Sequence, residues 1–378
     1  MRILSLSAAV TIALTSQNPA VADSVTTRLN QLETQNRAQE ATLQQQAAVI
    51  AEQQKTHMAE SDHSDWYRHI EVFGLIEVEA GSFSPETGNS ESDISLATVE
   101  LGIKSKVNAW VEAGASLLYE QDQTDLEVDT GYITIANTDV TPLFLTAGQL
   151  YVPFGVFETN MISDPLTLEI GETRETTLQI GATQGDFSGS VYLFNGDTTI
   201  DGENQIDNWG ANLGYAHTAN DQAWTASVGY LNDLGETDTM QAFVGDRAER
   251  TGGWTASASA TWGRFNLIGE YLAATDDFAA EHLSFKAQGA CPTAWNLEAG
   301  FTFAIMGKKS IASVGYQGTS EALALELPEQ RWLLGLAVEI FDKTSLKFEW
   351  ARSTDYDTAD GGSGDIDNRL LAQIAVEF

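Results

Sequence analysis

The acidic residues between Val152 and Glu175 are the set in this chain whose types and spacing are best suited to select ions. They alternate with large apolar residues, and one arginine accompanies them. The set comprises Glu158, Asp164, Glu169, Glu172, Arg174 and Glu175. Carboxylates that surround an aqueous path attract cations and repel small anions. These six residues are therefore candidates for the constriction of a pore, if the flanking elements place them around such a path.

Matches to known sets of catalytic residues are weak in this sequence. Tyr215, His217 and Asn220 partly match a Ser–His–Asn hydrolase set, but no serine with the right alternation accompanies them. Glu77 and Glu79 lie on the same face of a strand, as the two acids of a glycosidase or a calcium site could. A strand face that lines a water-filled lumen explains this pair more simply. The sequence has no glycine-rich phosphate loop and no Cys/His cluster. We therefore expect no catalytic residues, no metal and no cofactor.

Composition narrows the class of protein. The 378 residues include 19 basic and 54 acidic side chains, which gives a net charge of −35 and argues against nucleic acid as a partner. Hydrophobic residues make up 43% of the chain, too few for a bundle of transmembrane helices. Cys291 is the single cysteine, so no internal disulfide can form.

The N-terminal region predicts export and self-association. A basic start, a short apolar run and the small-residue sequence Ala20-Val21-Ala22 indicate that residues 1–22 are a removable signal peptide. Residues 23–60 follow a heptad pattern with several polar core positions, which predicts a periplasmic coiled coil and a homotrimer. A Gln-rich disordered spacer is the alternative for this segment. Residues 61–68 are expected to be a linker.

From residue 69 to residue 378 the chain follows a period of two. Residues 254–262 place tryptophans at both ends of an apolar face and hydroxyl groups on the opposite face. No other segment is large enough to cover so many apolar faces, so a lipid bilayer is the expected partner, with the polar faces lining a lumen. The candidate acids of that lumen wall are Glu71, Glu77, Glu79, Glu298 and Glu349.

Short turns alternate with long acidic connections along residues 69–378. An outer-membrane barrel has this layout. The pattern predicts an all-β transmembrane barrel of about 16 antiparallel strands, with 14 or 18 as alternatives, preceded by the α-helical coiled-coil segment. A soluble β-sandwich is a further alternative. Phe378 ends the last apolar face and resembles the terminal aromatic that outer-membrane assembly recognises.

The segment from Gly148 to Thr173, GQLYVPFGVFETNMISDPLTLEIGET, resembles the LbtU-type siderophore porin family of Gram-negative outer membranes. The motif residues are Tyr151, Pro153, Phe154, Gly155, Asn160, Asp164 and Pro165. The resemblance implies a barrel that takes up an iron–siderophore complex without a plug domain. A shorter piece, residues 151–155, also resembles phosphate-selective porins, which line their channels with arginine and lysine; few basic residues occupy candidate lumen positions here.

These observations predict a Gram-negative outer-membrane porin, a water-filled channel for small hydrophilic solutes or an iron–siderophore. A general cation-preferring or phosphate-type porin is one alternative, and a structural anchor that oligomerises through its coiled coil is another. Residues 152–175 are too apolar for a solvated loop, so we expect them to fold into the barrel and narrow it. Lipid-facing strand extensions or a trimer contact would also explain these apolar residues.

Overall fold

The computed structural model describes residues 69–120 and 124–378. The predicted signal peptide, coiled coil and linker lie outside these residues. Sixteen strands form the barrel: β1 (Ile70–Ser84), β2 (Glu91–Lys106), β3 (Val111–Glu120), β4 (Thr124–Ala136), β5 (Leu143–Tyr151), β6 (Arg174–Gln184), β7 (Phe187–Phe194), β8 (Asn208–Ala219), β9 (Gln222–Leu231), β10 (Gly253–Trp262), β11 (Phe265–Ala274), β14 (Thr293–Ile305), β15 (Lys308–Ser320), β16 (Gln330–Phe341), β17 (Thr344–Thr354) and β18 (Ile366–Glu377).

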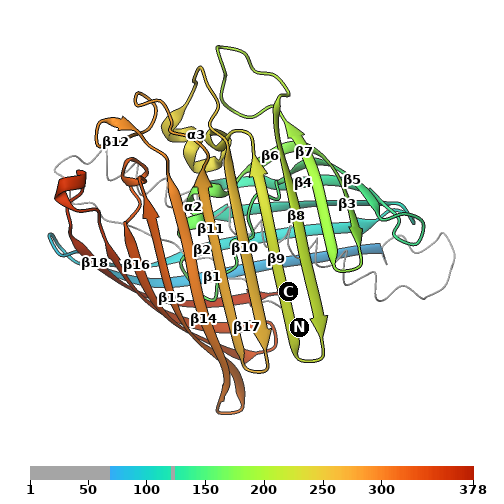
Figure 1. The fold of residues 1–378 in the computed structure, drawn as a ribbon. Coiled ribbons are helices and arrows are strands. Elements are labelled where there is room, and N and C mark those ends of the chain that lie inside the picture. Colours follow the sequence, from blue (N-terminus) through green and yellow to red (C-terminus); the bar gives the residue numbers. More distant parts are fainter. Residues whose placement is uncertain (1–68, 121–123) are drawn as a thin grey trace.

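Each barrel strand pairs in antiparallel fashion with its neighbours in sequence, and β18 pairs with β1 to close the sheet (Figure 1). Closure leaves no strand edge unpaired. The predicted closed barrel of sixteen antiparallel strands is therefore confirmed. Residues 284–289 form a separate small hairpin of β12 (Ser284–Phe285) and β13 (Gln288–Gly289), outside the barrel sheet.

The closing seam is fastened by Phe378. Its N–H donates to the Gly74 carbonyl and its carbonyl accepts the Gly74 N–H, both at 3.1 Å. Its ring lies over Gly74, where an added Cβ would come within 2.4 Å of the ring. The glycine therefore leaves room for the aromatic side chain at the junction of β18 and β1.

Side chains alternate between the two faces of the wall as the period of two predicts. On β10, Trp254, Ala258 and Trp262 face outward, and Thr255 is buried on the inner side. On β16, Leu334 is exposed on the outer face. The outer face is apolar, and the inner face carries most of the hydroxyl, amide and charged groups of the strands.

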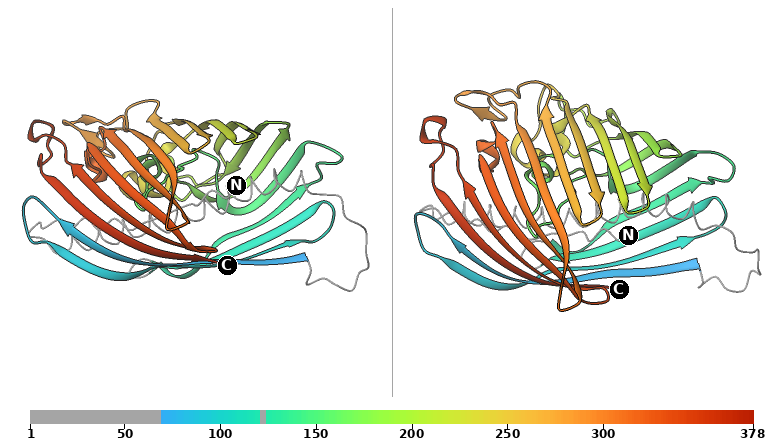
Figure 2. Two further views of the ribbon diagram at one scale, coloured as in Figure 1. Left: turned by 90° about the horizontal axis from the view of Figure 1, so that it is seen from below. Right: turned by 60° about the horizontal axis from the view of Figure 1, so that its bottom comes forward.

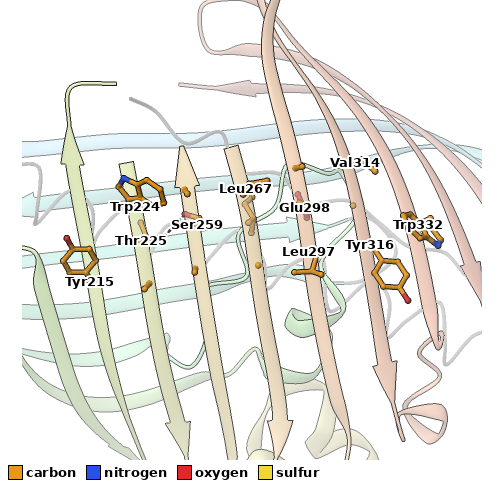
Figure 3. Close-up of a pocket in the computed structure, with 17 residues that line it drawn as sticks. Tyr215, Trp224, Thr225, Ser259, Leu267, Leu297, Glu298, Val314, Tyr316 and Trp332 are labelled. Carbon is orange, nitrogen blue, oxygen red and sulfur yellow. Dashed lines mark hydrogen bonds between the residues drawn. The ribbon is translucent and has the colours of Figure 1, made fainter. Parts of the chain in front are cut away.

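A shallow groove runs across the outer face between β8 and β16 (Figure 3). Its floor consists of small residues that oppose one another in register, such as Ala226 opposite Ala258 and Ala258 opposite Gly269. Trp224 and Trp332 lie toward its two ends. The groove is therefore a feature of the apolar outer surface and does not open into the lumen.

Tight turns lie at one end of the barrel and long connections at the other (Figure 1). The connections carry the short helices α2 (Leu166–Gly171), η2 (Leu234–Glu236), α3 (Asp238–Val244), η3 (Leu323–Leu325) and η4 (Thr358–Asp360). None of the helices in the described part of the chain is long and apolar enough to cross a membrane.

The buried apolar core is built by the long connections together with a few inward strand residues. The turned views show the strands wrapping around these connections (Figure 2). Core members from the connections include Phe154, Phe157, Leu166, Leu168, Ile170, Leu234, Met240, Val244, Phe278, Leu283, Leu325 and Leu327. Apolar side chains that would be costly to leave in water are thus buried among these connections and against the inner face of the strands.

Candidate functional site

Residues 152–173, here called the inner loop, connect β5 to β6 and lie inside the barrel. Phe154, Met161 and Leu166 of this loop are buried. The helix α2 contacts β11, β14 and β15 (Figure 1). The inner loop therefore crosses from its own strands, β5 and β6, to the part of the wall formed by later strands.

One anchor of the inner loop is Glu270 on β11. Its carboxylate accepts the backbone N–H of Val156 at 2.8 Å and that of Phe157 at 2.9 Å. The hydroxyl of Thr167 donates to the same carboxylate at 3.1 Å. Glu270 thus binds both the beginning of the loop and the start of α2.

Two further anchors continue along the wall. Glu298 on β14 accepts the Thr159 hydroxyl at 2.6 Å and the Asn160 N–H at 2.7 Å. Glu349 on β17 accepts the backbone N–H groups of Ile162 at 2.6 Å and Ser163 at 2.9 Å, and it also binds the Ser163 hydroxyl. Three glutamates on three strands therefore hold successive parts of one loop.

We call Glu270, Glu298 and Glu349 the wall carboxylates. All three are buried, and a buried charge is tolerated only where hydrogen bonds replace its hydration. The loop backbone has the complementary requirement, because a buried N–H without an acceptor costs about 1–3 kcal/mol. Each group satisfies the other, so the position of the loop is set by charge-assisted hydrogen bonds.

The motif residues shape the path of the loop. Tyr151 donates its hydroxyl to Asp129 of β4 at 3.1 Å. Gly155 has a φ of 110°, and a Cβ there would come within 2.3 Å of the Phe157 ring. Pro165 precedes α2 in an extended conformation, where its missing N–H leaves no donor unpaired. Phe154 is buried in the core.

The predicted constriction acids do not form an exposed ring. Asp164, Glu169 and Glu172 are buried and Glu158 is half-buried. The guanidinium of Arg331 on β16 donates to the Asp164 carbonyl at 3.3 Å. Burial raises the pKa of Glu169 to about 7, and the positive charges of Arg331 and Arg369 oppose that rise. Two wall arginines that the sequence did not single out therefore face the acids of the inner loop.

Arg174 and Glu175 lie at the start of β6, where the inner loop rejoins the wall. Arg174 pairs with Glu127 at 2.8 Å and with Asp129 at 3.2 Å, both on β4. Glu175 is buried. Burial raises the pKa of Glu172 well above its usual range, and the nearby Asp238 raises it further. This end of the loop is a cluster of acids with one adjacent arginine.

The β9–β10 connection covers the same end of the inner loop. The Thr237 hydroxyl donates to the Ile170 carbonyl at 2.7 Å, and the Asp238 N–H donates to the Glu172 carbonyl at 2.9 Å. In return, the Asp238 carboxylate accepts the Arg174 N–H at 3.0 Å. The inner loop is therefore held between the wall carboxylates and the start of α3.

That second layer has its own buried ion pairs. Arg247 pairs with Asp233 at 2.5 Å and with Glu236 at 3.1 Å, and it donates to the Thr198 hydroxyl at 2.9 Å. Asp233 caps η2 by accepting the Gly235 N–H. The network joins the β7–β8 and β9–β10 connections, so the cover over the inner loop is itself fixed.

The predicted lumen-wall acids separate into two groups. Glu298 and Glu349 hold the inner loop, whereas Glu71, Glu77 and Glu79 lie on β1. Gln373 of β18 donates to Glu79 at 2.7 Å.

The sequence analysis did not identify Glu270 as a functional residue. Glu270 lies between the outward-facing Gly269 and Tyr271 of β11, and this alternation indicated that its side chain faces inward. Within residues 69–120 and 124–378, no three His, Cys, Asp or Glu side chains are placed to hold a metal ion.

No family model matches the chain. It is similar to UPF0422 proteins of Gram-negative bacteria. It is 30% identical over 297 residues to one from Legionella pneumophila strain Lens, and 28% identical over 300 residues to one from Coxiella burnetii strain RSA 493. These alignments cover 71% and 75% of this chain. The chain spans only 56% of the Legionella protein and 64% of the Coxiella protein.

Similar solved structures are outer-membrane channels. They include the channel DcaP of Acinetobacter baumannii, with a TM-score of 0.56 and 14% identity over 82% of this chain and 97% of that one. An anion-selective porin from Comamonas acidovorans has a TM-score of 0.58 and 12% identity, covering 82% and 99%. OprB of Pseudomonas putida has a TM-score of 0.58 and 11% identity, covering 85% and 100%. At these identities the likeness establishes a porin-like fold.

Proposed function

We propose that this protein is a porin of a Gram-negative outer membrane, a water-filled channel whose width is set by the inner loop. The observation that carries the proposal is the attachment of residues 152–173 to the wall carboxylates. A barrel that served only as an anchor would have no need of a loop fixed across its interior at three points. The likeness in fold to outer-membrane channels supports the same function.

The geometry suggests how such a channel would work. The wall carboxylates fix the loop backbone, and a fixed loop removes part of the cross-section at a constant position. Solutes small enough to pass the remaining opening diffuse down their gradient. The hydrogen bonds that the backbone N–H groups of Asn160 and Ser163 donate to Glu298 and Glu349 place the middle of the loop, and this segment therefore sets the size limit.

Removing the middle of the loop tests this role. Deletion of Thr159 to Leu168 should raise single-channel conductance in planar bilayers and admit larger sugars in liposome-swelling assays. A matched control is deletion of the exposed residues 201–206 in the β7–β8 connection, which should leave both readings unchanged. If the folded wild-type barrel does not conduct at all, the porin proposal fails and the anchor alternative gains support.

Cation preference is the second part of the proposal. It is supported by the net charge of −35 and by Glu71 of β1, an inward acid that is exposed, whereas Glu77 and Glu79 of the same strand are buried. The loop acids contribute less than their number suggests, because Asp164, Glu169 and Glu172 are buried. A reversal potential measured across a KCl gradient should indicate K⁺ preference. Chloride preference would overturn this part and would favour a phosphate-type porin.

An iron–siderophore complex is the specific solute that we propose to test first, on the basis of the sequence resemblance around residues 148–173. Deletion of the gene should impair growth on the iron–siderophore as sole iron source, and the intact gene should restore it. Unimpaired growth would leave a general porin. The proposed periplasmic coiled coil and homotrimer concern residues 23–60 and would be tested by the association of that peptide.

A further inference from the structure

The tight turns of the barrel fall into two groups of opposite charge. The β4–β5, β6–β7 and β8–β9 turns each carry one exposed aspartate, namely Asp139, Asp186 and Asp221. The next three tight turns around the barrel, β10–β11, β14–β15 and β16–β17, carry four exposed basic residues, here called the basic edge: Arg264, Lys308, Lys309 and Lys343. Asp342 is the single carboxylate in these three turns. A chain with 54 acidic and 19 basic residues therefore concentrates positive charge in one sector of its turn end (Figure 1).

Contacts between the turns join the basic edge into one surface. The Arg264 carbonyl accepts the N–H of Thr302 on β14 at 2.7 Å, which ties the β10–β11 turn to the neighbouring strand. The Lys308 ammonium lies 5.4 Å from the centroid of the Phe341 ring, so the β14–β15 and β16–β17 turns are in contact. Only two residues separate the paired strands at each of the three turns. Such short turns leave the backbone little freedom, and the four charges therefore stay close together.

Ion pairs do not neutralise the basic edge. None of its four residues pairs with a carboxylate in residues 69–120 and 124–378, whereas Arg174, Arg247 and Lys286 all do. Like charges held near one another repel, and an anion bound from outside would remove this repulsion. The charge of the basic edge is therefore available to an external anionic partner.

Apolar residues adjoin the basic edge on the outer face. Trp262 contacts Phe265 with ring centroids 5.9 Å apart, and Phe265 contacts Phe301 at 5.1 Å. Aromatic rings at the margin of an apolar band lie at the level of the lipid headgroups. At the turns themselves, Met306 is 98% exposed and Phe341 is 67% exposed. A partner with an anionic head and an apolar body would satisfy both the charges and these apolar tips, whereas a free anion would satisfy the charges alone.

We propose that the basic edge binds the phosphate headgroups of anionic phospholipids in the membrane leaflet at the turn end of the barrel. The inference rests on the proposed outer-membrane location, in which the tight turns face the periplasm. Each basic residue next to an anionic lipid surface strengthens binding by about fivefold. Anionic lipids would thus collect beside β10 to β17 and avoid the sector that carries the three aspartates.

Native mass spectrometry of the full chain in detergent tests the proposal. The protein is mixed with equal amounts of phosphatidylglycerol and phosphatidylcholine that have identical acyl chains, and we expect it to retain phosphatidylglycerol preferentially. Lys308→Gln should weaken phosphatidylglycerol binding about fivefold, and Lys308→Gln combined with Lys343→Gln about 25-fold, with phosphatidylcholine binding unchanged. The matched control is Lys106→Gln, an exposed lysine beside the β2–β3 turn, which should have no effect.

Equal retention of the two lipids by the wild-type protein would overturn the proposal and leave the basic edge to a soluble acidic partner. An equal loss in Lys106→Gln would also overturn it. Glycerol 3-phosphate has the phosphate without the acyl chains, so it should displace phosphatidylglycerol only at a concentration at least roughly tenfold higher. Displacement at equal concentration would assign the edge to a free anion and contradict the lipid assignment.

Conductance in planar bilayers keeps this proposal and the porin proposal distinguishable. A wild-type barrel that conducts but retains both lipids equally would retain the porin and exclude the lipid site. A folded barrel that retains phosphatidylglycerol preferentially but does not conduct would support the lipid site and contradict the porin.

Discussion

The inner loop, residues 152–173, and the β17–β18 connection, residues 355–365 (here called the outer loop), are both acidic but are held in opposite ways. In the inner loop the backbone N–H groups belong to the loop and the carboxylates belong to the wall. In the outer loop, Asp355 accepts the Ser363 N–H at 2.7 Å and Asp357 accepts the Ala359 N–H at 2.8 Å, so its own carboxylates bind its backbone. Its side chains make the contacts to other connections, such as that of Asp360 with Lys286.

The difference shows what fixes a connection inside a barrel. Hydrogen bonds within the outer loop determine much of its shape, and its position is set by the strands at its ends together with side-chain contacts to neighbouring connections. The wall carboxylates determine both the shape and the position of the inner loop. They also act where water is largely excluded, so their hydrogen bonds are stronger than those at the exposed loop. Disturbing the two loops in parallel is therefore the most direct test.

The largest expected effect comes from Glu349→Ala. The change leaves the N–H groups of Ile162 and Ser163 without their charged acceptor and opens space beneath the loop. Each buried N–H left without an acceptor costs about 1–3 kcal/mol. We expect a lower unfolding temperature and a larger, noisier conductance. The matched change Asp355→Ala should alter neither conductance nor noise, and an equal effect of both would remove the distinction between the loops.

A charge introduced on the outer face of the barrel wall tests the assignment of its lipid-facing and inward-facing residues. Leu334 on β16 is exposed there, and arginine near the middle of a bilayer costs about 2–4 kcal/mol. Leu334→Arg should reduce the amount of folded protein in the outer membrane. The half-buried, inward Ser257 is the proper control. Thr255, which also faces inward, is unsuitable because it is buried beside Gly229. Equal damage from Leu334→Arg and Ser257→Arg would contradict the assignment of faces.

The sequence predicted the wall well because alternation is a local property. Each strand carries its own period of two, so the barrel and the faces of Leu334 and Ala258 followed without tertiary information. The excess of apolar residues in the inner loop likewise indicated burial. The partners of that loop were not predictable in the same way. Ser163 and Glu349 are 186 residues apart, and only the closed barrel brings them together.

The acids of the inner loop illustrate the same limit. Counting carboxylates between residues 152 and 175 suggested a charged ring, because sequence gives the number of charges but not their burial. In the structure Glu169 is buried and faces Arg331 and Arg369 from β16 and β18. Those arginines are distant in sequence, and their role depends on the register of strands that the local pattern does not specify.

Glu169 should make the stability of the inner loop depend on pH, and the outer loop should not show this dependence. Its pKa is about 7 in the folded protein, compared with 4.5 as the ordinary value, so the folded state binds more protons than the unfolded state between these values. Stability of the inner loop should therefore fall as pH rises from about 4.5 to about 7. Hydrogen exchange of residues 166–171 at pH 5 and pH 7.5 should show less protection at the higher pH. Glu169→Gln should remove most of this dependence, and an unchanged dependence in that variant would exclude Glu169 as its source.

The smallest expected effect is that of Asp357→Ala in the outer loop. Asp357 caps the short helix η4 through the Ala359 N–H, and both residues are exposed. Loss of such a cap costs about 1 kcal/mol, and water can replace the lost acceptor. We expect faster hydrogen exchange confined to residues 357–362, with conductance, ion preference and unfolding temperature unchanged. If this variant altered conductance as Glu349→Ala does, the outer loop would contribute to the constriction, and burial of the hydrogen bonds would not be what distinguishes the two loops.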